Sequence, residues 1–272
     1  MTDMRPVANA RMYSATPQVR ADWKRLLAWT LQEAGLPWEV IDYDPPAPLN
    51  ALWARSDLGL AMMCGLPFSQ RAVKPTLIAA PVPSPARYGG RPVYFSDIVV
   101  RADAPFQSLQ DTFGGTVGYT LADSMSGGVA WRAHLAPLRA ARGGQRLYAQ
   151  AVGDLIHARG VIQALVDGRI DVGPLDSYYH DLLRHNDPAF AAKVRTIAQT
   201  DPRPIPPFIA TAAIDPAALA GLRAALRAAV RATELRAETE RLLLADFAVP
   251  EAGDYDVLAE IAARPGPTFE EL

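Results

Sequence analysis

Six residues near the middle of the chain, 123–128 (Asp-Ser-Met-Ser-Gly-Gly), have the composition of an anion-binding turn. They follow a predicted strand at 116–119 and lead into a predicted helix at about 127–135. The start of a helix leaves backbone N–H groups free, and the helix dipole favours an anion there. Ser124 and Ser126 would add two hydroxyl donors, which predicts an oxyanion pocket. The alternative is an ordinary serine N-cap.

Three further residues could carry chemistry, and each also has a structural explanation. Cys64 stands in a tight Cys-Gly-Leu-Pro turn. It is either a reactive thiol or a small buried apolar side chain. His157 stands near the start of a predicted helix at 155–166 and faces either a ligand or solvent. Asp176 follows a predicted strand at 172–175 and either contacts a ligand or caps the next helix.

The remaining histidines, His134, His180 and His185, have no partners at metal-ligand spacing, so we interpret them as surface or structural residues. A single cysteine cannot supply a cysteine-rich metal site or an intrachain disulfide. A Walker-type phosphate loop and a dinucleotide glycine fingerprint are both absent from the sequence. We therefore predict no metal, no cofactor and no catalytic residues.

Charge and hydropathy exclude further classes of protein. The 27 basic and 29 acidic side chains give a net charge of −2, whereas nucleic-acid binders usually show a basic excess. No apolar run approaches the roughly 20 residues that cross a bilayer. The N-terminus lacks the basic start and apolar stretch of a secretory signal. As the sequence stands, we expect a cytoplasmic chain with no membrane insertion, unless its N-terminus has been trimmed.

Strand-like apolar runs alternate with helical stretches, which predicts an α/β fold. Strands are expected at 8–13, 38–43, 58–63, 77–81, 93–101, 116–119, 147–152, 172–175, 194–198 and 209–213. Helices are expected at 16–35, 49–54, 127–135, 155–166, 176–184 and 234–245, with one opening at 215 and one at 256. The proline-rich segment 201–207 is expected to be a linker.

The pattern restarts after residues 93–101, which predicts two lobes. Lobe 1 would begin with residues 1–96, lobe 2 would be the inserted residues 97–200, and residues 201–272 would return to lobe 1 as a strand and C-terminal helices. Two chain crossings suggest a cleft between the lobes, where ligands commonly bind.

Four segments carry a family resemblance: residues 94–100, 109–118, 123–127 and 164–177. In order and spacing, from about residue 8 to 213, they resemble the phosphate, phosphite and phosphonate solute-binding proteins of ABC transporters. The Cys64-Gly65-Leu66-Pro67 turn after Asp57-Leu58 resembles a branch of that family in which a signal peptide is often absent. The resemblance implies a two-lobed type II periplasmic-binding-protein fold, each lobe a mixed sheet flanked by helices. It also implies a small oxyanion ligand, an ABC permease as partner and, if the N-terminus has been trimmed or misassigned, a periplasmic location.

The resemblance also implies which residues would bind the ligand. In the serine turn these are Ser124, Met125, Ser126 and Gly127, where Met125 replaces a frequent threonine and so removes one hydroxyl donor. The other lobe would contribute Tyr13 and Ser14 after the first strand, and Cys64, Gly65 and Phe68 after the third. His157 would reach the anion, and Asp176 would pair with a ligand amine.

These observations favour a binding protein that is not an enzyme and whose two lobes close on a small oxyanion. One alternative is a cytoplasmic enzyme of cofactor biosynthesis on the same fold, with Cys64, His157 and Asp176 as its suspected residues. Another is an intracellular ligand sensor, although no helix-turn-helix segment is apparent in the sequence.

Overall fold

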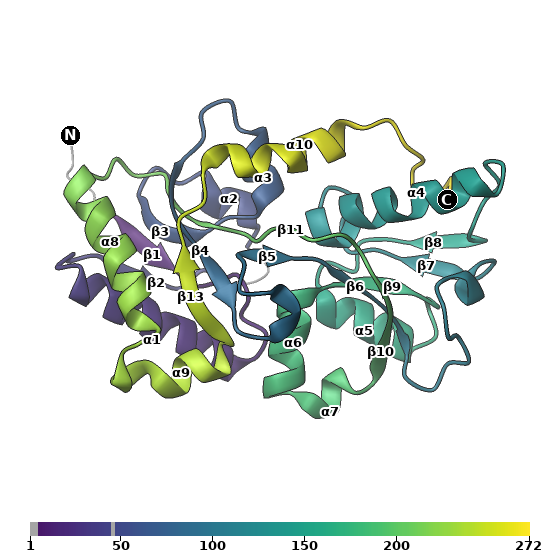
Figure 1. Cartoon of the computed structure of the whole chain (residues 1–272), viewed down its shortest axis with the longest axis horizontal. Helices are drawn as coiled ribbons and strands as arrows, with labels where there is room; N and C mark the ends of the chain where they lie inside the picture. Colours follow the sequence, from purple (N-terminus) through teal and green to yellow (C-terminus); the bar gives the residue numbers. More distant parts are fainter. Residues whose placement is uncertain (1–4, 45–46) are drawn as a thin grey trace. The chain divides into compact units, whose positions relative to one another are not determined.

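The computed structural model describes residues 5–44 and 47–272 and shows a mixed α/β protein, as predicted (Figure 1). Internal contacts divide the chain into two units. Unit 1 comprises Met1–Val93 and Pro204–Asp256, and unit 2 comprises Tyr94–Arg203 and Val257–Leu272. Each unit has its own sheets and helices, and each is described by itself.

Unit 1 is built on a six-stranded sheet with the order β13-β4-β12-β3-β1-β2. Its strands are β1 (Val7–Asn9), β2 (Glu39–Ile41), β3 (Leu58–Met62), β4 (Thr76–Pro83), β12 (Phe208–Ala210) and β13 (Leu244–Ala248). β1 pairs with β2 and with β3 in parallel, whereas β12 and β13 pair antiparallel with their neighbours. The turns that follow β1 and β3 therefore leave the same edge of the sheet.

The helices of unit 1 follow strong local signals. They are α1 (Pro17–Glu33), α2 (Leu49–Trp53), α3 (Gly65–Gln70), α8 (Pro216–Ala229) and α9 (Arg236–Arg241), with short 3₁₀ turns η1 (Ala86–Tyr88), η4 (Thr233–Leu235) and η5 (Ala252–Tyr255). In α1 the Thr16 hydroxyl accepts from the Val19 N–H at 3.1 Å, and Pro17 occupies the first turn. Gly35 follows the helix with a φ of 67°. The predicted cap, start and stop of this helix are confirmed.

The predicted helix at 234–245 is wrong at its C-terminal end. α9 stops at Arg241, Leu243 adopts a left-handed φ of 53°, and β13 begins at Leu244. β13 adds an antiparallel strand to β4 at the edge of the sheet. Pairing with a distant strand has overridden the local helical preference of this leucine- and alanine-rich segment.

Unit 2 contains two small sheets joined through one bridge. β6 (Ser96–Arg101) lies between β10 (Val194–Gln199) and β9 (Gly173–Asp176), antiparallel to both. β7 (Thr116–Gly118) and β8 (Gln150–Val152) are parallel. A parallel bridge between Val117 and Val172 places the approach to β9 beside β7. β8, β7 and β9 thus run side by side in one direction.

The two chain crossings differ from the prediction. The expected strand at 93–101 is two strands, β5 (Val93–Tyr94) and β6, interrupted at Phe95. The expected linker at 201–207 includes a short strand, β11 (Arg203–Pro204), which pairs with β5. Proline is tolerated there because such a short ribbon has exposed edges, where a missing N–H costs little.

The helices of unit 2 include one irregular turn. They are the 3₁₀ turn η2 (Gln110–Thr112), the π-helical turn η3 (Met125–Val129), α4 (Ala130–Ala141), α5 (Ala158–Val166), α6 (Ser177–Asn186), α7 (Pro188–Ala191) and α10 (Asp256–Ala263), which begins at the unit boundary. η3 runs directly into α4, so the helical stretch extends from Met125 to Ala141. Single π-helical turns inside helices are frequent at functional sites.

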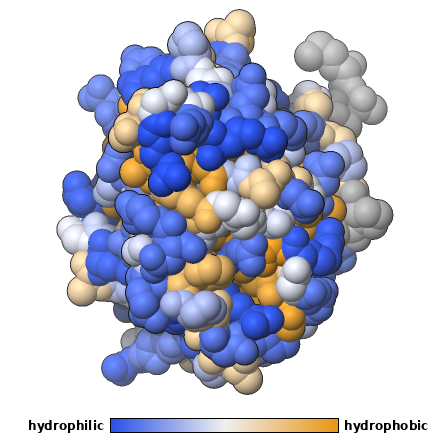
Figure 2. Space-filling view, turned by 90° about the vertical axis from the view of Figure 1, so that its right-hand side faces the viewer, coloured by the Kyte–Doolittle hydropathy of each residue, from blue (hydrophilic) through white to orange (hydrophobic). Residues whose placement is uncertain are grey.

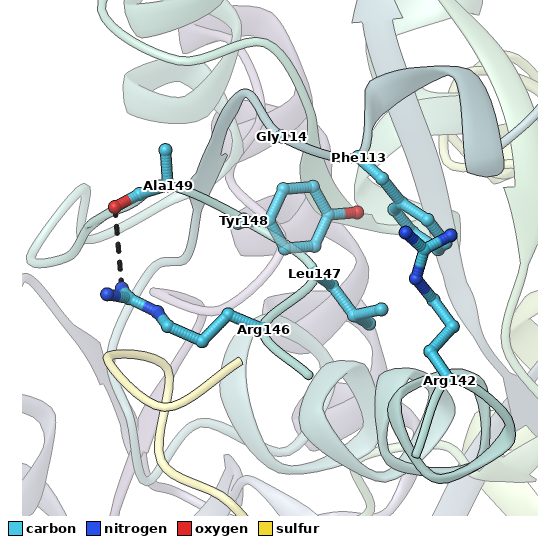
Figure 3. Close-up of a pocket in the computed structure, with 7 residues that line it drawn as sticks. All are labelled: Phe113, Gly114, Arg142, Arg146, Leu147, Tyr148 and Ala149. Atoms are coloured by element: carbon cyan, nitrogen blue, oxygen red, sulfur yellow. Dashed lines mark hydrogen bonds between the residues drawn. The ribbon is translucent and has the colours of Figure 1, made fainter. Parts of the chain in front are cut away.

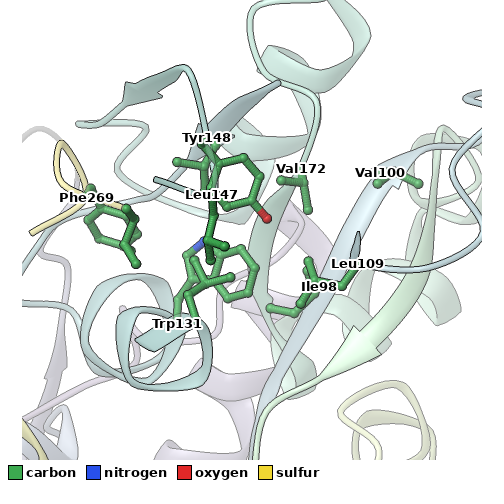
Figure 4. Close-up of a cluster of buried hydrophobic side chains, with 11 residues drawn as sticks. Ile98, Val100, Leu109, Trp131, Leu147, Tyr148, Val172 and Phe269 are labelled. Atoms are coloured by element: carbon green, nitrogen blue, oxygen red, sulfur yellow. The ribbon is translucent and has the colours of Figure 1, made fainter. Parts of the chain in front are cut away.

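The C-terminal segment completes the core of unit 2, which differs from the predicted return of all residues 201–272 to lobe 1. Phe269 stacks on Tyr119 at 4.0 Å between ring centroids. Leu272 is fully buried, and its carbonyl oxygen accepts the backbone N–H groups of Leu147 and Tyr148. Figure 4 shows Phe269 beside Leu147, with Trp131 below them. Burial of these apolar side chains holds the segment in unit 2.

The surface offers few large apolar side chains. Among the described residues, the exposed ones are Val73, Leu121, Ile156 and Val249. Figure 2 shows one face, on which hydrophilic residues cover most of the area and hydrophobic patches are small. No helix in the described part of the chain is both long enough and apolar enough to cross a lipid bilayer.

Candidate functional site

The serine turn follows β7 and includes the first residues of η3. The backbone carbonyl of Ser124 accepts from Gly128 N–H at 2.9 Å and from Val129 N–H at 2.8 Å, and the second of these bonds makes the turn π-helical. The Ser124 hydroxyl accepts from Gly127 N–H at 3.3 Å, so this side chain acts as the N-cap. Ser124 is therefore an ordinary serine N-cap, which was the alternative to an anion-binding role in the sequence analysis.

Ser126 is in a different position. Its hydroxyl, its backbone N–H and the backbone N–H of Met125 have no hydrogen-bond partner within the described part of the chain. These three groups lie at the start of the 17-residue helical stretch formed by η3 and α4, where the helix dipole is positive. Together they can donate hydrogen bonds to an anion.

Hydrogen bonds and two glycines hold the turn close to its surroundings, and the Thr120 N–H donates to the carbonyl oxygen of Gly127 at 3.2 Å. The Ser96 hydroxyl on β6 donates to the carbonyl oxygen of Ser126 at 2.7 Å. A Cβ on Gly127 would lie 1.7 Å from the Thr120 hydroxyl, and one on Gly128 would lie 2.3 Å from the carbonyl oxygen of Leu121. Only glycine permits this approach between the helix start and the segment that follows β7.

His157 caps α5 in the loop that follows β8. Its Nδ1 accepts from Gly160 N–H at 3.1 Å, so a neutral imidazole carries its proton on Nε2. The side chain is exposed, and Nε2 has no partner among the described residues. Asp154 and Ile156 in the same loop have left-handed φ values of 55° and 64°. Such strain in non-glycine residues clusters at functional sites.

Asp176 caps α6 at the end of β9. Its Oδ1 accepts from the N–H groups of Tyr178 and Tyr179, both at 3.0 Å. Oδ1 of Asp176 therefore acts as the N-cap of α6, which was the alternative to a ligand contact. Tyr179 is largely buried, which raises the pKa of its hydroxyl, while the nearby Arg159 opposes the shift.

The serine turn, His157 and Asp176 meet at one edge of unit 2. They follow β7, β8 and β9, which are parallel neighbours, so all three leave the carboxyl ends of the strands. The Leu155 N–H donates to the Tyr119 carbonyl at 3.4 Å and joins the first two loops. Ligands of open α/β sheets commonly bind outside this edge.

In unit 1, the first predicted pair of ligand residues follows β1. Tyr13 is 5% exposed and adopts a left-handed φ of 59°. The Ser14 hydroxyl donates to the carbonyl oxygen of Ala10 at 2.8 Å. The turn is therefore strained and internally bonded, which keeps its backbone in one conformation.

The second predicted set in unit 1 follows β3, at the same sheet edge as Tyr13 and Ser14. Cys64 is half-buried and precedes α3, and Gly65 is buried. Phe68 needs correction, because its ring is fully buried and packs edge-on against Tyr255 at 5.1 Å between centroids. We therefore interpret Phe68 as a core residue that supports the turn.

Two polar clusters of unit 2 were not foreseen. His180 is fully buried, so it is a structural residue and not a surface residue. Its Nδ1 lies 2.8 Å from Asp97 Oδ2. Gln199 donates to the other carboxylate oxygen of Asp97 at 3.0 Å. Arg203 lines the same crevice as Met125 and Ser126 of the serine turn. The partners of each cluster are far apart in the sequence, so no local pattern signals them.

A separate pocket of about 340 Å³ lies at the opposite edge of β7 and β8. It is lined by residues that precede these strands or follow α4: Phe113, Gly114, Arg142, Arg146, Leu147, Tyr148 and Ala149. Figure 3 shows the Arg142 guanidinium against Phe113, while Arg146 donates to the carbonyl of Ala149 at 3.4 Å. The pocket faces the amino ends of the strands and does not include the serine turn.

Across the described residues, no group of three or more histidine, cysteine, aspartate or glutamate side chains could hold a metal ion.

Two α/β units with small-residue turns at the carboxyl ends of parallel strands define a type II periplasmic-binding-protein fold. Residues 13–255 match the family described as "ABC transporter, phosphonate, periplasmic substrate-binding protein". This match spans most of the 272 residues, and the chain belongs to this family. The family resemblance found in the sequence is thereby confirmed. No curated protein is similar enough in sequence to count as a match.

Solved structures show the same fold. A binding-protein component of an ABC phosphonate transporter from Pseudomonas aeruginosa has a TM-score of 0.72 and 16% identity, covering 95% of this chain and 86% of its own. PhnD1 from Prochlorococcus marinus, solved with methylphosphonate, has a TM-score of 0.76 and 14% identity, with coverages of 95% and 97%. A protein from Xanthomonas citri bound to ATP has a TM-score of 0.61 and 21% identity, with coverages of 94% and 95%. At these identities the similarity concerns the fold.

Proposed function

We propose that this chain binds a small tetrahedral oxyanion, with phosphonates as the preferred class, and delivers it to an ABC permease. The observation that carries the proposal is the set of unpartnered donors on Met125 and Ser126 at the start of a long helical stretch. The proposal agrees with the family to which the chain belongs and with the methylphosphonate held by a protein of the same fold.

Met125 favours a phosphonate over phosphate. Its side chain lines the same crevice as Ser126 and offers no hydrogen bond, where a hydroxyl would have served a further oxygen. A phosphonate has three oxygens and one carbon substituent, so it leaves fewer oxygens unpaired beside an apolar side chain. We expect methylphosphonate to bind more tightly than phosphate or sulfate.

The remaining residues of the proposed ligand set divide by role. Ser126, Gly127 and His157 would touch the anion, and Ser124 would shape the turn by capping it. Tyr13, Ser14, Cys64 and Gly65 stay predicted contacts from unit 1, and Asp176 stays a predicted contact whose Oδ1 is already engaged as a cap.

A ligand screen tests the proposal. Purified protein is mixed with methylphosphonate, 2-aminoethylphosphonate, phosphite, phosphate, sulfate and several carboxylates, and thermal unfolding is followed. A ligand at a hundredfold its Kd stabilises the native state by about 2.7 kcal/mol, which a thermal shift detects. Calorimetry then ranks the hits. If none of the oxyanions stabilises the protein, the proposal is overturned.

Two serine variants locate the site. Ser126→Ala removes the unpartnered hydroxyl, and we expect it to weaken methylphosphonate binding by about tenfold. Ser84→Ala is the matched control, because Ser84 is exposed and its hydroxyl makes no hydrogen bond within the described residues. Equal affinities of the two variants would place the ligand elsewhere.

The family is one of transport receptors, so the alternatives of a cofactor-biosynthesis enzyme and of a ligand sensor are not favoured.

The family is described as periplasmic, and we propose the same compartment for this chain. Fractionation of the native cells tests this, since recovery only with cytoplasmic markers would contradict it. Closure of the lobes on the ligand stays a prediction, and small-angle scattering with and without methylphosphonate tests it.

A further inference from the structure

Arg203 is a basic side chain that the sequence prediction did not include in the site. It begins β11 and lines a narrow crevice in unit 2, which its side chains close so tightly that no room for a water molecule is left. The other lining residues are Tyr94, Phe95, Ser96, Met125, Ser126, Ala130 and Thr200. Arg203 therefore shares this crevice with the serine turn, although 77 positions separate it from Ser126.

Only some of the hydrogen-bond donors of the Arg203 guanidinium have an acceptor. Its Nη1 donates to the carbonyl oxygen of Pro202 at 3.0 Å, and its Nη2 lies 3.4 Å from Asp201 Oδ2. Asp201 is 82% exposed, so water screens this ion pair. The Nε atom is buried and has no partner within the described residues. A buried donor of a charged group without an acceptor is costly, and a ligand oxygen would remove that cost.

The other unsatisfied groups around the crevice are also donors. Met125 and Ser126 offer free backbone N–H groups, and Ser126 offers its hydroxyl. The neighbouring polar atoms are already engaged, since the Thr200 hydroxyl accepts from Ser96 N–H and the Ser96 hydroxyl donates to the Ser126 carbonyl. A ligand that satisfies this set must be rich in acceptors and negatively charged.

We propose that Arg203 is a direct ligand of the bound oxyanion and selects for two negative charges over one. This inference rests on the proposed function. A guanidinium keeps its charge at every physiological pH, and hydrogen bonds from it to an anion are about twice as strong as neutral ones. The helix start adds only about half a charge, so Arg203 supplies most of the attraction for a second negative charge. The flexible Met125 side chain moves aside to admit the ligand.

Two ligands of the same shape and different charge test the inference. Methylphosphonate carries two charges at mildly alkaline pH, while methanesulfonate is tetrahedral and carries one. By calorimetry, we expect the unmodified protein to bind methylphosphonate at least about tenfold more tightly. Arg203→Gln should weaken methylphosphonate binding by about tenfold and methanesulfonate binding by less than about threefold, which removes the charge selectivity.

Arg169→Gln is the matched control. Arg169 is exposed in the loop after α5, and its side chain makes no hydrogen bond or ion pair among the described residues. The variant changes the net charge of unit 2 as Arg203→Gln does, but not the crevice. If both variants act alike, or if Arg203→Gln weakens the two ligands equally, the role of Arg203 is overturned while oxyanion binding stands.

Two further outcomes are separable. If the unmodified protein binds neither ligand, the role of Arg203 is overturned, and the proposed function is overturned as well when no other oxyanion of the screen binds. Thermal unfolding without ligand shows whether Arg203→Gln is folded. Should it not fold, Arg203→Lys, which keeps a positive charge but lacks the Nε–H, must weaken methylphosphonate binding by about threefold or more. Unchanged binding by this variant would overturn the inference.

Discussion

The Ser96 hydroxyl on β6 donates a hydrogen bond of 2.7 Å to the backbone carbonyl of Ser126 in the serine turn. Ser96 is fully buried, and its N–H donates to the Thr200 hydroxyl at 2.9 Å. The residue with free donors is thus attached to β6, a strand that is paired on both sides. A site positioned by packed elements holds its ligand more exactly than one on a free loop.

Ser96→Ala should therefore affect both stability and binding. Loss of this hydrogen bond should lower the free energy of unfolding by about 1 kcal/mol and leave the turn less ordered. We expect a weaker affinity for methylphosphonate, measured by calorimetry, with denaturation in urea reporting stability. A variant that loses stability but keeps full affinity would show that the anchor does not position the ligand.

Gly128→Ala should disrupt the turn directly. The new methyl group would lie 2.3 Å from the Leu121 carbonyl oxygen and 2.7 Å from that of Ala122, and backbone atoms cannot yield as a flexible side chain can. We expect a loss of about 2 kcal/mol or more in urea denaturation. Gly266→Ala is the control, because its methyl group would meet no atom within 4 Å. Similar losses in both variants would mean that the close approach is not the cause.

His157 combines a cap with an unpartnered Nε2, and two substitutions separate these roles. His157→Ala should cost about 1 kcal/mol by removing the cap on Gly160 N–H. His157→Asn keeps an acceptor for the cap and removes Nε2. We expect it to retain most of the stability while weakening methylphosphonate binding in calorimetry. Full affinity in His157→Asn would assign His157 to capping alone.

The free energy of unfolding should fall in alkaline solution because the Tyr148 hydroxyl is buried. Burial raises the pKa of its hydroxyl, which also lies 3.1 Å from the Thr112 hydroxyl. The native state therefore holds this proton more tightly than the unfolded chain, so the stabilisation is complete below about pH 10 and is lost above it by about 1.4 kcal/mol per pH unit. Urea denaturation between about pH 8 and 11 measures the decline. Tyr148→Phe should decline less steeply, and an identical slope would contradict the assignment.

Phe269 should matter for the stability of unit 2 although only three residues of the sequence follow it. Its ring is 3% exposed and stacks on Tyr119, so Phe269→Ala should cost about 3 kcal/mol. Arg264→Ala, at an exposed position before the segment, should change stability by less than about 0.5 kcal/mol. Comparable stabilities of the two variants in urea would show that the C-terminal segment is not part of the core.

The local elements followed from the sequence because their signals are local. Thr16, Pro17 and Gly35 bracket α1 within one stretch of chain, and each acts through its own backbone or a neighbour three residues away. The serine turn could likewise be recognised, since a strand, small polar residues and a helix follow one another directly. The family resemblance also rested on short segments, of which the serine turn is one.

What failed or was missed depends on partners that are distant in the sequence. β13 pairs with β4 although its residues favour a helix locally, and His180 meets Asp97 from 83 positions away. Phe68 follows a candidate turn in the sequence, yet its contact with Tyr255 places it in the core. Packing, which local patterns do not encode, decides each of these cases.

The sequence alone therefore determined the α/β class, the family and the donor-rich turn at Ser126, because helix starts and hydroxyl groups are local properties. Only the tertiary structure decided that the turns after β7, β8 and β9 share one edge, since parallel pairing brings them together. It also decided that Ser124 caps the turn while Ser126 stays available, and that Arg203 reaches the same crevice. Hydrogen bonds and burial between remote segments set which candidate side chains remain free to meet a ligand.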